Sequence, residues 1–282
     1  MKSILLPTDF SNNSLNAIKY AVNMFKDIPC DFYLLNVQKA SSFISDDMMV
    51  MSASTTIYET LISAAKKSIE NIISKIETKY KNEKHQFHSI VDYDNLIDSI
   101  NQTCNIHNID LIVMGTKGAS GFKKVIFGSN TVHVMQRCPV PVLAIPDNYK
   151  FSGLNKVAFS TNHLALNSVS ELKPLKDLFS IFKFDLDILH IRDEDNAYYE
   201  VFNNETFFQT NFNNVKHYYL TIKVDAILKS VQNYIDVNSI EMLAIMNKKH
   251  AFLQRLFKQY LVETIAFKVD VPFLVMPKTE TL

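Results

Sequence analysis

The sequence predicts an α/β protein made of two tandem doubly wound (Rossmann-like) domains, each a five-stranded parallel sheet with helices on both faces. Short apolar runs of strand length alternate with longer segments whose apolar residues recur at helical spacing. The pattern occurs twice, because residues 240–277 align with 109–146 at a constant offset of 131 without a gap. A repeat of this size indicates one domain duplicated in tandem. We expect the domains to span residues 1–148 and 155–282, with the polar stretch 147–154 as linker.

Five strands are expected in the first half of the chain. The first, residues 4–6, ends at a polar turn, and several hydroxyl residues after it can cap a helix. A long amphipathic helix is expected over residues 61–80, and Asp94 can cap a shorter helix after the third strand. The other strands are expected at 32–37, 87–91, 110–114 and 140–145. Single helices between successive strands imply right-handed crossovers and a parallel sheet covered on both faces.

The second half repeats this order with one deletion. Residues 156–161 parallel the first strand, and residues 184–191 parallel the second. The interval from the second to the third strand is about 28 residues shorter than in the first half. We therefore expect the second helix of this copy to be much reduced or absent.

Composition narrows the function classes. The formal net charge is zero and the pI is about 7.1, so there is no electrostatic case for nucleic acid or an anionic membrane as partner. No apolar run approaches the ~20 residues of a spanning helix, and the N-terminus resembles no signal peptide, so cytoplasmic residence is expected. Cys30, Cys104 and Cys138 are expected to be buried, reduced thiols. His85 and His88 lack the companions that a metal site needs.

Four of the five glycines lie within one short stretch, Gly115 to Gly128. Gly115 ends the apolar run of the fourth strand, and Gly118 and Gly121 follow it closely. Such positions permit positive φ or close approach to the main chain, as a loop that binds an anion through its N–H groups requires. Small polar residues at 128–131 then begin a helical stretch, and the free N–H groups of a helix start favour phosphate binding.

The glycine spacing, G-x2-G-x9-G-S from Gly115 to Ser129, fits neither the P-loop nor the dinucleotide fingerprint. It resembles the nucleotide-binding signature of the universal stress protein family, which lies between the fourth strand and the last helix of its ATP-binding members. ILLPTDFS at residues 4–11 and YLLNV at 33–37 resemble the family's first strand with its acidic turn and its second strand. The resemblance covers nearly the whole chain, as a tandem two-domain member.

The resemblance implies an ATP site, with or without Mg²⁺, in the first domain. Asp9, beside Pro7 and Thr8, would accept hydrogen bonds from the base or ribose. Val37 would present its backbone amide and carbonyl to the adenine edge, and Met114 would pack near the sugar. The phosphate contacts would come from Gly115, Lys117, Gly118, Gly128, Ser129, Asn130 and Thr131. Roles without a ligand also remain open for three residues. Asp9 and Ser129 could be ordinary helix N-caps, and Lys117 could be a solvated charge in a loop.

The second copy has lost the glycine signature. At the offset of 131, the residues that replace Gly115, Gly118, Gly128 and Ser129 are Met246, Lys249, Gln259 and Tyr260. In the opening strand, Asn162 stands where the first copy has Asp9. Because a β-carbon obstructs both positive φ and close phosphate approach, we expect no nucleotide binding of this kind in the second domain.

The stretch 115–131 holds no carboxylate to bind a metal or position a water, so no enzymatic activity is expected. The leading hypothesis is an ATP-binding stress-response protein whose nucleotide occupancy changes its conformation or association. The alternatives are an interaction scaffold that binds no nucleotide and, with less support, a slow ATPase.

Family members commonly associate through their last strands. Here residues 140–145 and 271–276 would pair within one chain as a pseudo-dimer, or between chains in a homodimer. The connector 39–56, with three methionines, suits a lid, a docking surface or a plain mobile link. The aromatic and Asn-rich run 196–214 is a candidate partner surface.

Overall fold

The computed structural model describes residues 1–38, 51–116, 128–161, 169–193, 205–222, 227–247 and 270–277. The first half of the chain holds β1 (Ser3–Pro7), α1 (Asn12–Met24), β2 (Cys30–Val37), α2 (Met51–Tyr80), β3 (His85–Asp92), α3 (Leu96–His107), β4 (Leu111–Gly115), α4 (Ser129–Arg137) and β5 (Val142–Ile145). The second half holds β6 (Lys156–Thr161), a 3-10 helix (Val169–Leu172), α5 (Lys173–Phe182), β7 (Asp185–Asp193), α6 (Glu205–Asn211), β8 (Val215–Ile222), α7 (Ile227–Asn238), β9 (Met242–Asn247) and β10 (Phe273–Pro277).

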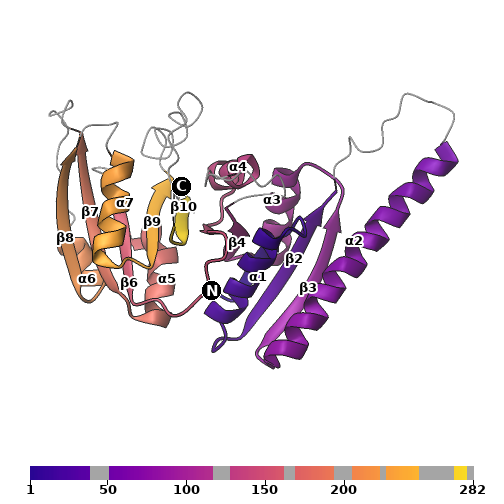
Figure 1. The fold of residues 1–282 in the computed structure, drawn as a ribbon, viewed down its shortest axis with the longest axis horizontal. Helices are drawn as coiled ribbons and strands as arrows, with labels where there is room; N and C mark the ends of the chain where they lie inside the picture. The colour runs from indigo at the N-terminus through magenta and orange to yellow at the C-terminus, as the bar shows by residue number, and fades with distance from the viewer. Residues whose placement is uncertain are drawn as a thin grey trace.

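The ten described strands form one continuous sheet in the order β3-β2-β1-β4-β5-β10-β9-β6-β7-β8. Pairing is parallel within each half, and the two halves meet where β5 pairs with β10 in antiparallel fashion. Figure 1 shows the halves side by side, with α2 beside β3 at one end and β8 at the other. The predicted tandem Rossmann-like fold is confirmed. The predicted last-strand pairing occurs within the chain.

Helices cover both faces of the sheet and bury two apolar cores. One core contains residues from α1, α2, α5 and α6, including Ile18, Ile69, Leu175 and Phe208. The other contains residues from α3, α4 and α7, including Ile100, Val134 and Val231. Because successive strand residues point to opposite faces, Leu5 joins the second core while its neighbours on β1 join the first.

Strand register confirms the internal repeat. Ile112 of β4 pairs with Val142 of β5. The residues 131 positions further on, Leu243 of β9 and Phe273 of β10, form the same pair in the second half. The constant offset seen in the sequence is therefore a constant structural register.

One acidic residue in each half repeats the same contact. Asp110 precedes β4, and its carboxylate accepts the N–H of Ser3, the first residue of β1, at 3.2 Å. Its counterpart Glu241 precedes β9 and accepts the N–H of Lys156, the first residue of β6, also at 3.2 Å. Each carboxylate thus satisfies a backbone donor at the start of its domain's first strand.

The second helix differs between the copies as expected. It has 30 residues in α2 and 7 in α6. Several element boundaries differ from the prediction. In particular, α2 begins at Met51, so the end of the expected connector 39–56 is helical, and β5 begins at Val142. Residues 39–50 lie outside the described part of the chain.

The aromatic run 196–214 contributes to the core where it is described. Phe208 is fully buried and Phe212 is 3 % exposed. Their rings pack against Phe159 and Phe179. For this part of the run the expectation of a partner surface is wrong, because its aromatic rings fill the core of the second domain; residues 196–204 lie outside the described chain.

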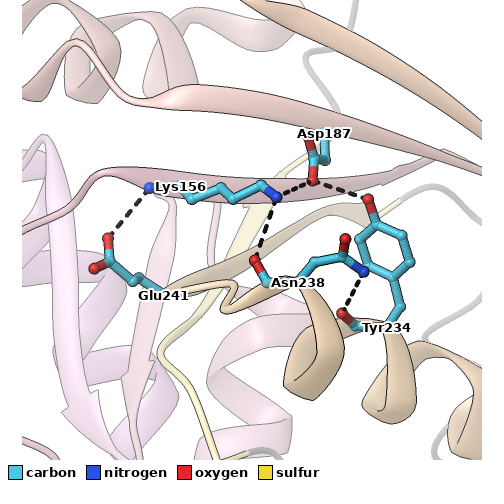
Figure 2. A network of polar contacts seen from close by, with 5 residues as sticks. All are labelled: Lys156, Asp187, Tyr234, Asn238 and Glu241. Carbon is cyan, nitrogen blue, oxygen red and sulfur yellow. Dashed lines mark hydrogen bonds and ion pairs between the residues drawn. The ribbon is translucent and has the colours of Figure 1, made fainter.

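A buried polar network ties three elements of the second domain together (Figure 2). The carboxylate of Asp187 on β7 is fully buried, lies 3.1 Å from Lys156 Nζ and accepts the Tyr234 hydroxyl at 2.9 Å. Lys156 Nζ also donates to the carbonyl of Asn238 at the end of α7, at 3.2 Å. Burial, helped by hydrogen bonds to Tyr218 and Asp187, raises the pKa of Tyr234. These donors offset the cost of burying the carboxylate.

The linker connects α1 to the second half. The side-chain amide of Asn16 donates to the carbonyl of Tyr149 at 3.1 Å. Tyr20, one turn further along α1, packs its ring against Tyr149 and Phe151. The Tyr149 hydroxyl reaches the carbonyl of Glu241 at 3.5 Å. The helix that begins beside β1 is therefore in contact with the linker between the copies.

The cysteines behave as predicted. All three are buried and free. Burial raises the pKa of Cys30 to about 11 and those of Cys104 and Cys138 to about 12, so the thiols stay protonated in the folded chain. Among the described helices, none is long and apolar enough to cross a membrane.

Candidate functional site

A cavity of about 700 Å³ opens at the carboxyl ends of β1, β2 and β4, beside α4. This is where parallel α/β sheets bind ligands. Eight of the twelve predicted site residues line it: Pro7, Thr8, Asp9, Val37, Met114, Gly115, Asn130 and Thr131. Gly128 and Ser129 begin α4 next to the cavity, and Lys117 and Gly118 lie outside the described residues.

The turn after β1 is fixed by side-chain hydrogen bonds. Thr8 Oγ1 accepts the N–H of Phe10 at 3.1 Å and lies 3.0 Å from the hydroxyl of Ser14. Asp9 Oδ1 accepts the N–H of Ser11 at 3.0 Å. Ser11 is the N-cap of α1, since its hydroxyl accepts the N–H of Ser14. Asp9 is therefore not the helix cap, and its exposed carboxylate lies at the rim of the cavity.

The end of β2 presents the backbone groups of Val37 to the cavity. The Leu35 carbonyl accepts the N–H of Thr8 at 2.8 Å, so by the alternation of a parallel ladder the backbone groups of Val37 face the same side. Because β1 ends at Pro7, no β1 residue lies opposite Val37. The Thr8 carbonyl accepts the side-chain amide of Asn36, at 2.7 Å, instead of the Val37 N–H. Among the described residues, neither the N–H nor the carbonyl of Val37 has a partner on this side.

Gly115 has a packing role. A β-carbon there would lie 1.9 Å from Asn13 Oδ1, so glycine lets α1 pack close against the end of β4. Two hydrogen bonds then join β4 to α4: Thr131 Oγ1 donates to the Gly115 carbonyl at 2.9 Å, and the Gly128 N–H donates to the Thr116 carbonyl at 2.7 Å. The Thr131 hydroxyl and the Gly128 N–H thus serve the protein's own structure, where the resemblance implied phosphate contacts.

The first turn of α4 holds three backbone donors that have no partner in the part of the chain that the structure describes. Gly128 is the N-cap and supplies no side-chain hydrogen bond. The first intrahelical bond runs from the N–H of Val132 to the Gly128 carbonyl. Within the described chain, the N–H groups of Ser129, Asn130 and Thr131 therefore lack a partner, as expected of an uncapped helix start. They carry the positive end of the helix dipole.

Nine lining residues were missed by the sequence reasoning: Ser14, Leu35, Asn36, Asp94, Asn95, Leu96, Ile97, His133 and Arg137. Asp94 to Ile97 follow the carboxyl end of β3, so the rule that placed the other strand ends together would have found them. Asp94 was expected to cap the next helix, but Asn95 does so, accepting the N–H of Ile97 at 2.9 Å. His133 and Arg137 follow Asn130 at helical spacing, and this spacing predicts that all three lie on one side of the helix.

The described residues hold no cluster of metal-ligating side chains. No group of three His, Cys, Asp or Glu side chains there could hold a metal ion. The ring of His85 contacts the carbonyl of Phe25 at 3.0 Å, and the ring of His88 contacts Asp31 at 2.9 Å. Both imidazoles thus have partners within the protein.

In the second copy, one signature position is described. Met246, the counterpart of Gly115, lies in β9 and is 3 % exposed. It pairs with Met276, as Gly115 pairs with Ile145. Asn162, Lys249, Gln259 and Tyr260 lie outside the described residues.

Comparison with known proteins places the chain in a family. The model of the universal stress protein family matches residues 1–146. Universal stress protein MJ0531 of Methanocaldococcus jannaschii is 26% identical over 144 residues, which cover 51% of this chain and 81% of the relative.

Two solved structures resemble the whole chain in fold. A universal stress protein from Archaeoglobus fulgidus has a TM-score of 0.66 at 17% identity, covering 98% of this chain and 96% of its own. Protein PA1789 from Pseudomonas aeruginosa has a TM-score of 0.60 at 12% identity, covering 98% and 92%. With the family model over more than half of the residues and the duplicated fold described above, this chain belongs to the universal stress protein family as a tandem two-domain member.

Proposed function

We propose that the first domain binds an adenine nucleotide in the cavity, and that nucleotide occupancy changes the conformation or association of the chain. One observation supports the proposal: the cavity is bordered by the backbone donor and acceptor of Val37 and by three N–H groups at the start of α4, and none of these has a partner among the described residues. The first pair suits a base and the second set suits phosphate.

The base and sugar would lie against the strand ends. The adenine edge carries an amino donor and ring-nitrogen acceptors, which complement the carbonyl and N–H of Val37. Asp9, whose exposed carboxylate lines the cavity, would accept hydrogen bonds from ribose hydroxyls or base donors. Met114 lines the cavity and supplies an apolar surface beside the sugar.

The phosphates would lie at the start of α4. The N–H groups of Ser129, Asn130 and Thr131 and the helix dipole together favour an anion there. By the family resemblance, Lys117 and Gly118 would add contacts. In this assignment Thr131 and Gly128 act through their hydrogen bonds to β4, which hold the helix start in place.

We propose binding without turnover. Hydrolysis requires a group that positions a water at the terminal phosphate, usually with a metal held by carboxylates. The carboxylates among the described lining residues, Asp9 and Asp94, come from the turn after β1 and the turn after β3. Both lie on the side of the cavity formed by the strand ends, where the base and sugar are assigned, and away from the start of α4, where the phosphates are assigned.

Ser129→Pro tests the phosphate site. Ser129 is the first residue of α4 and its N–H makes no intrahelical bond, so proline removes one donor and keeps the helix. Gly128 has φ −59° and ψ 148°, a conformation that a following proline permits. Ser129→Ala is the matched control, because it removes the hydroxyl and keeps the N–H.

We expect ATP affinity, measured by titration calorimetry, to fall about tenfold in Ser129→Pro relative to Ser129→Ala, with unchanged thermal stability. Equal affinities would remove the α4 start from the site. If mass spectrometry finds no nucleotide in freshly purified protein and calorimetry detects no binding, the interaction-scaffold hypothesis takes its place.

A further inference from the structure

The geometry of α4 points to a selectivity device: we infer that His133 and Arg137 make the cavity prefer nucleotides with more than one phosphate group over nucleoside monophosphates and cyclic nucleotides. The inference rests on the proposed function, because it concerns the ligand of the same cavity. It assigns a role to two residues that the glycine signature does not include.

One polar stripe of α4 faces the cavity along the whole helix. Asn130, His133 and Arg137 are spaced i, i+3 and i+7, so they lie on one side of the helix, and all three line the cavity. Val134 and Met135 are buried and hold the helix against the core. The cavity therefore extends from the first turn of α4 to its last.

The stripe gives the cavity two separate places for anionic groups. The first is the set of N–H groups at the start of α4 that have no partner among the described residues. The second is Arg137, whose Cα lies about 10 Å beyond that of Asn130 along the helix axis at 1.5 Å per residue, and whose side chain is long enough to reach back over part of that distance. A ligand with a single phosphate group occupies one place, whereas a ligand with a second phosphate group can occupy both.

The charged residues around the cavity favour phosphate binding at α4 over phosphate binding at the strand ends. The carboxylates of Asp9 and Asp94 line the strand-end side of the cavity and repel anions there. The Arg137 guanidinium can bind phosphate through two parallel N–H groups. The His133 ring can donate an N–H.

Arg137 also has an ordinary structural role to separate from this one. It lies in the last turn of α4, where a cation complements the helix dipole. Loss of that interaction would lower helix stability slightly and weaken every ligand alike. Selectivity between ligands is therefore the diagnostic measurement.

The test is calorimetry on the full chain with ATP, ADP, AMP, cyclic AMP and adenosine 3′,5′-bisphosphate. We expect the wild type to bind ATP at least tenfold more tightly than AMP or cyclic AMP. Arg137→Gln should weaken ATP about tenfold and AMP less than twofold, with His133→Gln acting in the same direction. Lys229→Gln, which removes one exposed charge from α7 of the second domain, is the matched control and should leave all affinities unchanged.

The two-phosphate ligands identify the source of the second group. If Arg137→Gln weakens ADP more than adenosine 3′,5′-bisphosphate, the second phosphate belongs to a polyphosphate chain; the reverse places it on another ribose position. Equal wild-type affinities for ATP and AMP, or equal losses in Arg137→Gln, would overturn the inference and leave nucleotide binding standing. No binding of any adenine nucleotide would instead overturn the proposed function, and with it this inference.

Discussion

Gly115 is a residue whose structural role depends on a contact with a distant part of the chain. The sequence pattern assigns it to a phosphate-binding loop, whereas the structure makes it the point where Asn13 of α1 meets β4. Asn13 is about 100 residues away in sequence, so no local sequence pattern predicts the contact. The position of the glycine could be predicted, but its packing role could not.

Gly115→Ala should therefore destabilise the fold. The added β-carbon would overlap the Asn13 side chain, and overpacking of this kind costs about 1–3 kcal/mol. Urea denaturation followed by circular dichroism measures the free energy of unfolding. Because the clash is with the Asn13 side chain, Asn13→Ala combined with Gly115→Ala should lose less stability than the two single variants added together. Strict additivity would show that the two residues do not share this contact.

The starts of α1, α3 and α4 were predicted to within a residue or two, whereas α2 begins ten residues before the predicted position 61, and the caps were predicted less well. The alternation of apolar runs gave every strand of the first half, because burial on both faces of a parallel sheet leaves a strong pattern. Asn95 rather than Asp94 caps α3, since both residues are good caps and the backbone geometry decides between them. The network around Asp187 was missed because its partners come from three elements far apart in sequence.

β7 and β8 carry a histidine pair that should make the second domain sensitive to acid. His190 Nε2 and His217 Nδ1 lie 2.9 Å apart, and Phe208 of α6 packs on the His217 ring. Burial lowers the pKa of His217, although nearby Glu205 acts in the opposite direction. Folding thus disfavours the charged form, so its contribution to stability is present above about pH 6.5 and is lost as pH falls through the lowered folded-state pKa.

His217→Gln tests this element, since glutamine does not titrate and can still hydrogen-bond to His190. We expect the melting temperature to fall less between pH 7.5 and pH 5 in the variant than in the wild type. Thermal melts followed by circular dichroism at the two pH values provide the comparison. An identical fall in both proteins would place the acid sensitivity elsewhere.

For the whole molecule, the sequence left two arrangements of the last strands open. Pairing of 140–145 with 271–276 uses the same side chains within one chain or between two, so sequence alone could not decide. The structure gives the first: β5 lies between β4 and β10, and β10 between β5 and β9. The expected homodimer through these strands therefore has no free edge to use.

We accordingly predict a monomer in solution at micromolar concentration. The unpaired edges of the described sheet are those of β3 and β8, at its two ends. Light scattering coupled to size exclusion should give a mass near 32.3 kDa, with or without nucleotide. A mass twice as large would show that association uses a surface other than the last strands.

The two hydrogen bonds between β4 and α4 have a consequence for engineering. They bring the Gly128 N–H within 2.7 Å of the Thr116 carbonyl, so the two positions that flank residues 117–127 lie side by side. The entropy of closing such a segment changes little with its length. We therefore predict that the sheet and α4 keep their places when another stretch is grafted between these two ends in place of residues 117–127.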